Sequence, residues 1–414
     1  MSATSSSASI YAPPGATRAA RTAAADTPSA SPLSQLLTPV AVLDVERMDR
    51  NIARMQAQMN RLGVRFRPHV KTAKSLPVAQ RQLEAGADAI TVSSLKEAEA
   101  FFEAGVTDIL YAVAIAPNKF GAALELRRRG CGLKLLTDSP DAARALATFG
   151  RGQRHWFDLL IEVDSDGHRA GVEPQDPRLL EIATALGRGP TDEGGARLAG
   201  VMTHAGASYE LHTQDALVRM AEQERSRCVE AAQRLRAAGY GCGIVSVGST
   251  PTALSARSLE GVTEVRAGVY VFFDLVMANV GVCAIDDIAL SVLASVIGHQ
   301  PEKGWAIVDA GWMAMSRDRG TQSQLHDYGY GQVCDIDGRP IEGLTMTGAN
   351  QEHGIVAFGE GADAGRADII SRLPVGTLLR ILPNHACATA AQFDAYQALL
   401  SSGDLVRWKR FGGW

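Results

Sequence analysis

Between residues 44 and 271 the sequence alternates short apolar runs with stretches of helical spacing, and this alternation constrains the fold more than any other feature. The runs are apolar throughout, which is typical of parallel strands covered by helices. Eight such strands, with helices between them, predict a closed (β/α)8 barrel of the TIM type. A doubly wound open sheet is the alternative, but no Gly-x-Gly-x-x-Gly motif follows any of the runs. The predicted strands are 64–70, 87–92, 108–113, 132–137, 157–164, 198–204, 244–248 and 265–271, and the predicted helices are 44–62, 74–85, 94–104, 139–149, 176–187, 213–238 and 252–259.

The pattern changes after residue 280, where strand-like runs follow one another with few helical stretches between them. Asp337-Gly338 is a plausible hairpin turn within this region. An apolar run at 40–43 precedes the first helix and is expected to join the same sheet as an extra strand. We therefore predict a barrel domain of residues 44–279 and a discontinuous β-rich domain of residues 38–43 together with 280–414. The predicted strands of this domain are 288–297, 305–309, 332–336 and 377–382.

Residues 1–37 differ in composition from the rest of the chain, because Ser, Ala, Thr and Pro dominate and large apolar side chains are scarce. Such a segment cannot bury enough apolar surface to fold, so we predict a disordered tail. It has no apolar core region of the kind found in secretory signals. Its richness in Ser, Ala and Arg leaves an organellar transit peptide as the alternative.

The charge and cysteine content exclude several classes of protein. A formal net charge of -4 is not basic enough to predict nucleic-acid binding, and no apolar run is long enough to span a membrane. The six cysteines are scattered without a Cys-x-x-Cys pair, which argues against a disulfide scaffold in a chain of 414 residues. The cysteines instead indicate a reducing compartment, and we expect a cytoplasmic protein.

The first predicted strand ends at Lys71, within Pro68-His69-Val70-Lys71-Thr72. In a barrel of this kind, catalytic groups project from the carboxyl ends of the strands. An amine there becomes nucleophilic, and able to form a Schiff base, when desolvation or a cationic neighbour such as His69 lowers its pKa. Seen alone, Lys71 would be interpreted as an ordinary surface lysine.

Other strand ends carry polar groups that suit the same chemistry. The seventh strand runs into Gly-Ser-Thr and a proline-started helix, where hydroxyl and backbone donors can hold a phosphate. Such a triplet alone is more often a turn and helix cap. A lysine and a phosphate cradle at one barrel mouth together predict pyridoxal 5'-phosphate (PLP). The polar residues at these ends are Arg169 after the fifth strand, His204 after the sixth, Gly248, Ser249 and Thr250 after the seventh, and Arg266, Gly268 and Tyr270 on the eighth.

These motifs, namely Pro-His-Val-Lys-Thr, His-Arg-Ala-Gly, Met-Thr-His, Arg-x-Gly and a later Pro-Asn-His-Ala-Cys, resemble those of alanine-racemase-like, fold-type III PLP enzymes. The similarity is greatest to the branch of D-serine dehydratase, D-threo-3-hydroxyaspartate dehydratase and D-threonine aldolase, and it covers about residues 38–400. The resemblance implies that Lys71 forms the Schiff base, that Arg169 contacts the phenolic oxygen of PLP, and that His204 packs against the pyridine ring. It also implies that Arg266 faces the pyridine nitrogen, with Tyr270 or another group as the alternative in this branch. The residues that it implies for the phosphate region are Gly248, Ser249, Thr250, Gly268 and Tyr270.

His385 and Cys387 in the β-rich domain form the second candidate site. Their spacing alone favours a buried cysteine beside a polar histidine, since catalytic zinc usually has three protein ligands. The resemblance implies a metal, because the family carries His-x-Cys in dehydratases and His-x-Asp in aldolases. Thiolate suits Zn²⁺ whereas carboxylate suits Mn²⁺ or Mg²⁺, so we expect Zn²⁺, with Mn²⁺ or another divalent ion as the alternative.

Together the two sites predict a PLP- and zinc-dependent lyase that converts a D-configured β-hydroxy amino acid, of the D-serine or D-threo-3-hydroxyaspartate type, to a 2-oxo acid and ammonia. Retro-aldol cleavage to glycine and an aldehyde is the alternative, and Cys387 in place of aspartate argues against it. A racemase needs a second base that we do not identify, and a non-catalytic PLP-binding protein normally lacks a second domain. The polar segment 309–318 is expected to complete the site of a neighbouring chain, which predicts a homodimer.

Overall fold

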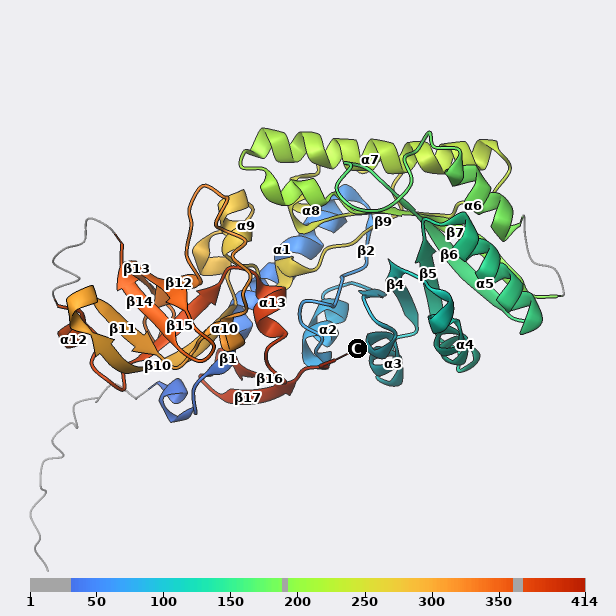
Figure 1. Ribbon diagram of the computed structural model, residues 1–414. Coiled ribbons are helices and arrows are strands. Elements are labelled where there is room, and N and C mark those ends of the chain that lie inside the picture. Colours follow the sequence, from blue (N-terminus) through green and yellow to red (C-terminus); the bar gives the residue numbers. More distant parts are fainter. Residues whose placement is uncertain (1–30, 188–192, 360–367, 414) are drawn as a thin grey trace, which may run out of the picture. The chain divides into compact units, whose positions relative to one another are not determined.

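The structure is a computed structural model that describes residues 31–187, 193–359 and 368–413. Its parallel strands are β2 (Arg65–Phe66), β3 (Ile90–Val92), β4 (Asp108–Ala114), β5 (Gly132–Thr137), β6 (Trp156–Val163), β7 (Gly195–Thr203), β8 (Ile244–Val247) and β9 (Glu264–Val265). In the described ranges these strands lie in the order β2-β9-β8-β7-β6-β5-β4-β3. A parallel bridge between His69 and Thr91 joins the two outer strands, so the sheet closes into the predicted barrel (Figure 1).

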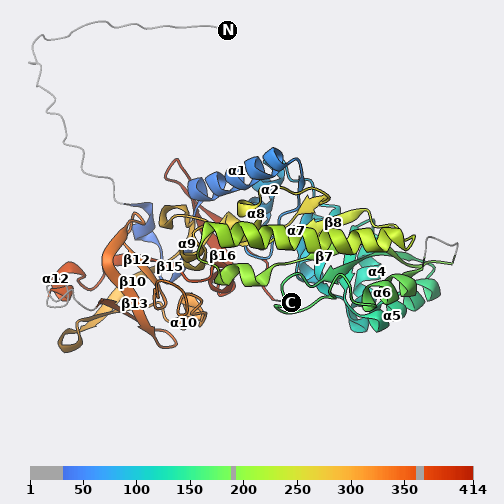
Figure 2. The same ribbon diagram turned by 90° about the horizontal axis from the view of Figure 1, so that it is seen from above.

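The barrel helices lie outside the sheet, and α7 runs along the outer face beside α8 (Figure 2). Helix α1 illustrates why they form: Asp44 caps it by accepting the N–H of Arg47 at 3.0 Å, and Gly63 ends it in the left-handed conformation with φ of 67°. Its buried face includes Met48, Ile52 and five further residues at helical spacing. The helices are α1 (Val45–Leu62), α2 (Leu76–Glu84), α3 (Leu95–Glu103), α4 (Phe120–Arg128), α5 (Pro140–Gly152), α6 (Arg178–Leu186), α7 (Gln214–Ala237) and α8 (Thr250–Ser255).

Two parts of the barrel differ from the prediction. Helix α4 was not predicted, because it follows a 3-10 helix that starts at Pro117 and because it contains Gly121, and both weaken the helical pattern. The eighth strand was predicted to reach residue 271, but it ends at Val265, and residues Val269–Val271 form a short 3-10 helix. Close packing explains the early end, since a side chain at Gly268 would come within 3.1 Å of the His69 carbonyl oxygen.

The second sheet contains β1 (Val40–Asp44), β10 (Leu290–Gln300), β11 (Trp305–Val308), β12 (Gly331–Cys334), β13 (Pro340–Ala349), β14 (Gly354–Phe358), β15 (Leu378–Pro383), β16 (Ala395–Leu399) and β17 (Leu405–Lys409). Six antiparallel strands of the described chain form a ring in the order β10-β11-β14-β13-β12-β15, and β15 pairs again with β10. The ring encloses its own apolar core. Strand β1 pairs with β10 outside this ring and continues it through β16 and β17.

The strand predicted at 40–43 is confirmed, and so is the Asp337-Gly338 turn, which joins β12 to β13 with Gly338 at φ of 83°. Strands β13, β14, β16 and β17 were not predicted. Much of β13 and β17 is exposed, so polar residues interrupt their apolar pattern. Short helices lie between the strands, namely α9 (Leu275–Val280), α10 (Trp312–Met315), α12 (Ile369–Arg372) and α13 (Ala386–Ala390).

The chain before β1 is only partly described. Residues 1–30 of the predicted disordered tail lie outside the described residues. Residues Pro32–Gln35 form a 3-10 helix that buries Leu33, so regular structure begins before the predicted end of the tail at residue 37. A search of the described helices found none with the length and apolar character needed to cross a membrane.

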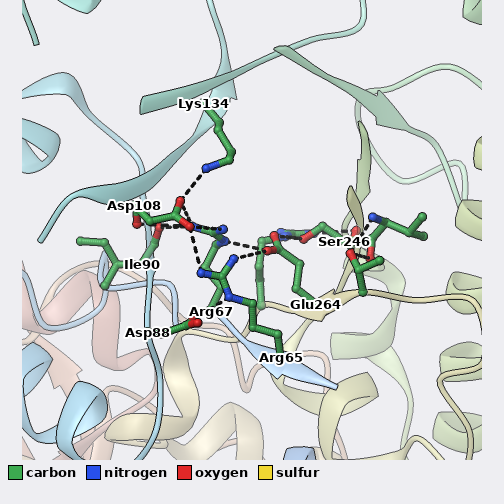
Figure 3. A network of polar contacts seen from close by, with 11 residues as sticks. Arg65, Arg67, Asp88, Ile90, Asp108, Lys134, Ser246 and Glu264 are labelled. Atoms are coloured by element: carbon green, nitrogen blue, oxygen red, sulfur yellow. Dashed lines mark hydrogen bonds and ion pairs between the residues drawn. The ribbon is translucent and has the colours of Figure 1, made fainter. Parts of the chain in front are cut away.

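A network of paired charges lies at the amino-terminal ends of the barrel strands (Figure 3). Arg67 is fully buried, and its guanidinium donates to Glu264 and Asp108, each at 2.9 Å. Asp108 also accepts from Lys134 at 2.6 Å and from Arg65 at 2.9 Å. These residues stand on four different strands or just beyond them, so the network ties together the end of the barrel that we call the base.

Candidate active site

A cavity of about 810 Å³ lies at the carboxyl ends of the barrel strands, opposite the base, where residues of the two sheets meet. Barrel strand ends line one side of it, and segments of the second sheet line the other. All the predicted site residues except Tyr270 line this cavity: Lys71, Arg169, His204, Gly248, Ser249, Thr250, Arg266, Gly268, His385 and Cys387. The residues predicted for PLP and those predicted for the metal therefore face the same space.

Tyr270 points away from the cavity. Its hydroxyl accepts a hydrogen bond from Gln82 Nε2 at 2.7 Å, and its ring packs edge-on against Phe66. The short eighth strand explains this, because the 3-10 helix after Gly268 turns the phenol back into the protein. The alternative in which the Tyr270 hydroxyl faces a pyridine nitrogen is therefore wrong. Its backbone N–H still donates to Thr250 Oγ1 at 3.2 Å, at the cavity wall.

Two neutral histidines lie close enough to Lys71 for its charge to act on them. Burial and then the positive charge of Lys71 lower the pKa of His69 well below its usual range. The same two causes lower the pKa of His204 to about 3, and its Nδ1 lies 3.0 Å from the Gly248 carbonyl oxygen. The expectation of a cationic His69 beside the lysine is therefore wrong.

The two arginines of the cavity differ in how firmly the protein holds them. Arg266 is buried, with Nε donating to Ser246 Oγ at 2.8 Å and Nη2 donating to the Thr203 carbonyl oxygen. Burial lowers the pKa of Arg266 below its usual value, and Glu224 and Glu264 oppose that shift. Arg169 is half exposed and makes one longer contact, 3.4 Å, to the buried carboxylate of Glu162. Arg169 thus keeps donors available to a ligand.

The segment predicted to hold phosphate is tightly bonded to the protein. Gly248 has φ of 133°, and a side chain there would overlap the Arg266 carbonyl oxygen, so only glycine fits. Its N–H donates to the buried Glu224 at 3.0 Å. Ser249 forms a capping box with Thr252, so its hydroxyl serves the start of α8. Thr250 Oγ1 accepts from the Tyr270 N–H, which leaves its own hydroxyl proton for another acceptor.

His385 and Cys387 lie between β15 and the first turn of α13, where their side chains reach the cavity. His385 Nδ1 lies 2.6 Å from Asp318 Oδ2, and the His385 side chain is also hydrogen-bonded to Cys387. Nε2 can bind a metal once it has lost its proton. Cys387 Sγ is hydrogen-bonded to Thr72 Oγ1 at 3.1 Å. Burial opposes ionisation of the Cys387 thiol, but protonated His385, Lys71 and Thr72 outweigh burial and lower the thiol pKa. Burial likewise opposes protonation of His385, but Cys387 and Asp318 outweigh it and raise the pKa of His385 to about 11. The pair therefore offers an imidazole nitrogen and a thiolate, the donors that suit zinc.

The described part of the chain holds no group of three or more His, Cys, Asp or Glu side chains that could bind a metal by themselves. A metal at His385 and Cys387 would need the rest of its ligands from water or substrate. The donor types and the carboxylate behind His385 fit such a metal. The amine, the two guanidinium groups and the Thr250 hydroxyl likewise fit PLP, an anionic aldehyde.

Three residues around these sites were not predicted. Asp318 orients His385, Thr72 contacts Cys387, and Asp274 accepts the N–H of Ala386 at 2.9 Å while capping α9. Asp318 belongs to the polar segment 309–318 that the sequence analysis singled out. The residues that Asp318, Thr72 and Asp274 contact could not be predicted, because each lies far from its partner in the sequence. Asp309, at the start of that segment, does not line the cavity, because its carboxylate accepts from Ser295 N–H and Thr38 Oγ1.

Comparison with known proteins agrees with the arrangement of both sheets. The alanine racemase N-terminal domain matches residues 43–276, and the putative serine dehydratase domain matches residues 289–399. A D-threo-3-hydroxyaspartate dehydratase from Delftia sp. (strain HT23) is 64% identical over 92% of this chain and 99% of its own. A D-serine dehydratase from Dictyostelium discoideum is 28% identical over 90% of this chain and 96% of its own. Among solved structures, a cysteine-to-alanine mutant of D-threo-3-hydroxyaspartate dehydratase in a metal-free form superposes with a TM-score of 0.89, at 64% identity over 92% of this chain and 99% of that one.

Proposed function

Since the chain belongs to the family of the alanine racemase N-terminal domain, here joined to a serine dehydratase domain, we propose that it is a PLP- and metal-dependent lyase. Its substrate is a D-configured β-hydroxy amino acid of the D-threo-3-hydroxyaspartate type, which it converts to a 2-oxo acid and ammonia. The 64% identity to a dehydratase of that name supports the substrate class. The observation that carries the proposal is the single cavity lined by Lys71, His385 and Cys387.

The barrel side of the cavity would hold PLP. Lys71 supplies the amine that binds its aldehyde, Arg169 and Arg266 supply positive charge, and Thr250 supplies a hydroxyl donor. Neutral His204 offers a flat, uncharged ring, since its low pKa keeps it deprotonated at pH 7. When bound, PLP withdraws electrons from the substrate's α-carbon and so makes its proton acidic.

Lys71 is the group that we assign to this proton. Lys71 lines the cavity, and both neighbouring histidines are neutral, so neither supplies a competing charge. When it is not bonded to PLP, the Lys71 amine could accept the α-proton. The Thr72 hydroxyl, one residue further along, contacts Cys387 and so links the lysine loop to the metal residues.

The second-sheet side would hold the metal through His385 Nε2 and Cys387 Sγ. Held there, a divalent ion would supply a Lewis acid for the β-hydroxyl, the group that leaves in the dehydration. A thiolate and an imidazole as donors favour Zn²⁺ over Mg²⁺. Asp318 keeps the His385 ring in place by accepting from Nδ1.

Incubation of the pure protein with D-threo-3-hydroxyaspartate, D-serine and D-threonine tests the proposal directly. We expect a 2-oxo acid and ammonia in equal amounts, with the first substrate used most efficiently. Glycine and an aldehyde in their place would assign the retro-aldol reaction to this site. Racemisation without either product, or no reaction with any of the three, would contradict a lyase of this class.

We further propose that the enzyme is a cytoplasmic homodimer. Apolar Val113 and Leu325 are exposed at or next to the cavity, where a second chain would cover them. All six cysteines, which lie in described parts of the chain, are free thiols, and this supports a reducing compartment. Light scattering that finds a fully active monomer would contradict the dimer.

A further inference from the structure

The loop that follows Lys71 is held by the C-terminal part of the chain at four consecutive residues. Each of residues 72–75 makes a hydrogen bond to a residue more than 300 positions later. Three of these bonds are made by residues of β16, of β17 and of the segment after β17. The fourth is made by Cys387, one of the two proposed metal ligands. The bonds are Thr72 Oγ1 with Cys387 Sγ at 3.1 Å, Tyr396 Oη to Ala73 O at 2.7 Å, Phe411 N to Lys74 O at 2.7 Å, and Ser75 Oγ to Lys409 O at 2.8 Å.

The loop needs such support because its backbone is strained. Lys74 has φ of 45°, a region that residues with a side chain rarely occupy. Its Nζ pairs with the buried carboxylate of Glu97 at 2.9 Å, which holds the side chain on the barrel wall. Lys74 lies three positions after Lys71, so relaxation of its backbone would move the Lys71 amine.

The C-terminal residues are themselves firmly anchored. Tyr396 is fully buried on β16, and its ring packs edge-on against Phe272. The Phe411 ring packs edge-on against Phe101 of α3 with centroids 5.3 Å apart. Lys96 on the same helix donates to the Gly412 carbonyl oxygen at 2.7 Å. The C-terminal segment is thus fixed to the barrel on both sides of its contacts with the loop.

We propose that Tyr396, Lys409 and Phe411, which we call the C-terminal brace, position Lys71 for its reaction with PLP and substrate. The inference rests on the proposed function only in assigning that reaction to Lys71. The brace residues do not line the cavity, so they act through the backbone of residues 73–75. They are positioning residues. Their loss should misplace the Lys71 amine without removing any side chain that lines the cavity.

The Tyr396→Phe variant tests the brace by removing one hydroxyl. Tyr111→Phe is the matched control, because Tyr111 is also fully buried and its hydroxyl contacts only Lys119 among its described bonds. For each variant we would measure borohydride labelling of Lys71 after addition of PLP, kcat and KM, and the melting temperature of the PLP-free protein. We expect Tyr396→Phe to slow labelling and to lower kcat by about tenfold, with KM little changed, since misplacement of a reacting group affects turnover most.

Tyr111→Phe should leave labelling and kcat unchanged even if it lowers the melting temperature as much as Tyr396→Phe does. Wild-type labelling and turnover in correctly folded Tyr396→Phe would overturn the brace. Equal losses in both variants would do so as well, because the effect would then be general destabilisation. A wild-type protein that takes no label at Lys71 would instead overturn the proposed function.

A second pair of variants isolates the backbone bond from Phe411 to Lys74. Phe411→Ala and Phe411→Pro both lose the ring contact with Phe101, but only proline also loses the N–H donor. We expect Phe411→Pro to label Lys71 about fivefold more slowly than Phe411→Ala, as expected for a misplaced reacting group. Identical labelling rates in the two variants would show that this N–H does not position the loop.

Discussion

At the base of the barrel the guanidinium of Arg67 is fully buried between Glu264 and Asp108, whereas at the mouth the amine of Lys71 faces a cavity of about 810 Å³. Both cations, Arg67 at the base and Lys71 at the mouth, follow β2, the first strand of the barrel, and they are only four residues apart in the chain. At the base every carboxylate of the network has cationic partners within 3.0 Å (Figure 3). At the mouth the arginine nearest to solvent, Arg169, has one contact at 3.4 Å.

This contrast indicates that residues at the base contribute mainly to stability and that residues at the mouth contribute mainly to catalysis. A buried ion pair with all its partners in place is costly to break, because the remaining charge stays desolvated. A cation without a full set of protein partners, such as Arg169, has donors left for a ligand. Ser246 connects the two ends, since its hydroxyl donates to Glu264 and accepts from Arg266. Variants at the base should therefore change stability, and variants at the mouth should change turnover.

Lys71→Ala is expected to have the largest effect. Turnover should fall by at least about three decades, because both the amine that binds PLP and the proposed base are lost. Lys71→Arg should fail as well, since a guanidinium stays protonated and cannot attack an aldehyde. Steady-state kinetics and the melting temperature of the PLP-free protein check this together. Full turnover by Lys71→Ala, or a borohydride label on Lys74, would contradict the assignment.

Removal of the metal should have the next largest effect at the mouth. Turnover should fall by roughly two to four decades, because the β-hydroxyl loses its Lewis acid. PLP should stay bound, which its visible absorption reports. Added Zn²⁺ should restore activity better than Mg²⁺, since thiolate favours the softer ion.

The Cys387→Asp variant should weaken this preference for zinc and shift products towards glycine and aldehyde. Asp318→Asn, which keeps the size of the residue behind His385, should weaken metal affinity by about tenfold or more. If protein freed of metal by a chelator still produced 2-oxo acid at the full rate, the metal role of His385 and Cys387 would be contradicted, and the two residues would serve only in packing.

Asp108→Asn should lower the free energy of unfolding and leave turnover unchanged. Its loss leaves Arg67 and Lys134 with weaker partners at the base, at a cost of about 2 kcal/mol in the free energy of unfolding. Urea denaturation measures that cost, and kcat of the folded variant should match the wild type within a factor of about two. A large fall in kcat with unchanged stability would reverse the assignment of the two ends.

The smallest expected effect is the pH dependence that Asp108 contributes. Burial would raise its pKa, but Arg67, Lys134 and Arg65 outweigh burial and hold the pKa well below the usual 3.8. A carboxylate with a lowered pKa stabilises the folded state above 3.8, and this contribution is lost as the pH falls below that value. Unfolding free energies from pH 7 down to about pH 3 should therefore fall less steeply for Asp108→Asn than for the wild type. Parallel curves would contradict this role.

The residues that lie together at the mouth could be predicted from the sequence, because the strands of a barrel bring their carboxyl ends to one place regardless of the segments that connect them. Lys71, His204 and Arg266 could therefore be grouped without knowing any distance. Tyr270 was misplaced because the length of its strand depends on how closely Gly268 approaches His69, which no local pattern records. The partners Asp318 and Tyr396 were out of reach for a related reason, since each contacts a residue far away in the chain through tertiary packing alone.

Strand β1 has a consequence for how the chain is made. Val40 pairs with Leu293 of β10, and Val42 pairs with Gln397 of β16, so β1 leaves the ribosome long before either partner exists. At typical synthesis rates the wait for β10 lasts on the order of tens of seconds, during which both edges of β1 are unpaired. The barrel elements are complete before β10 emerges, but Cys387 and the brace are translated only near the end. A nascent chain therefore carries Lys71 throughout most of its synthesis without the loop contacts that position it, and reactivity towards PLP should arise only with the final residues.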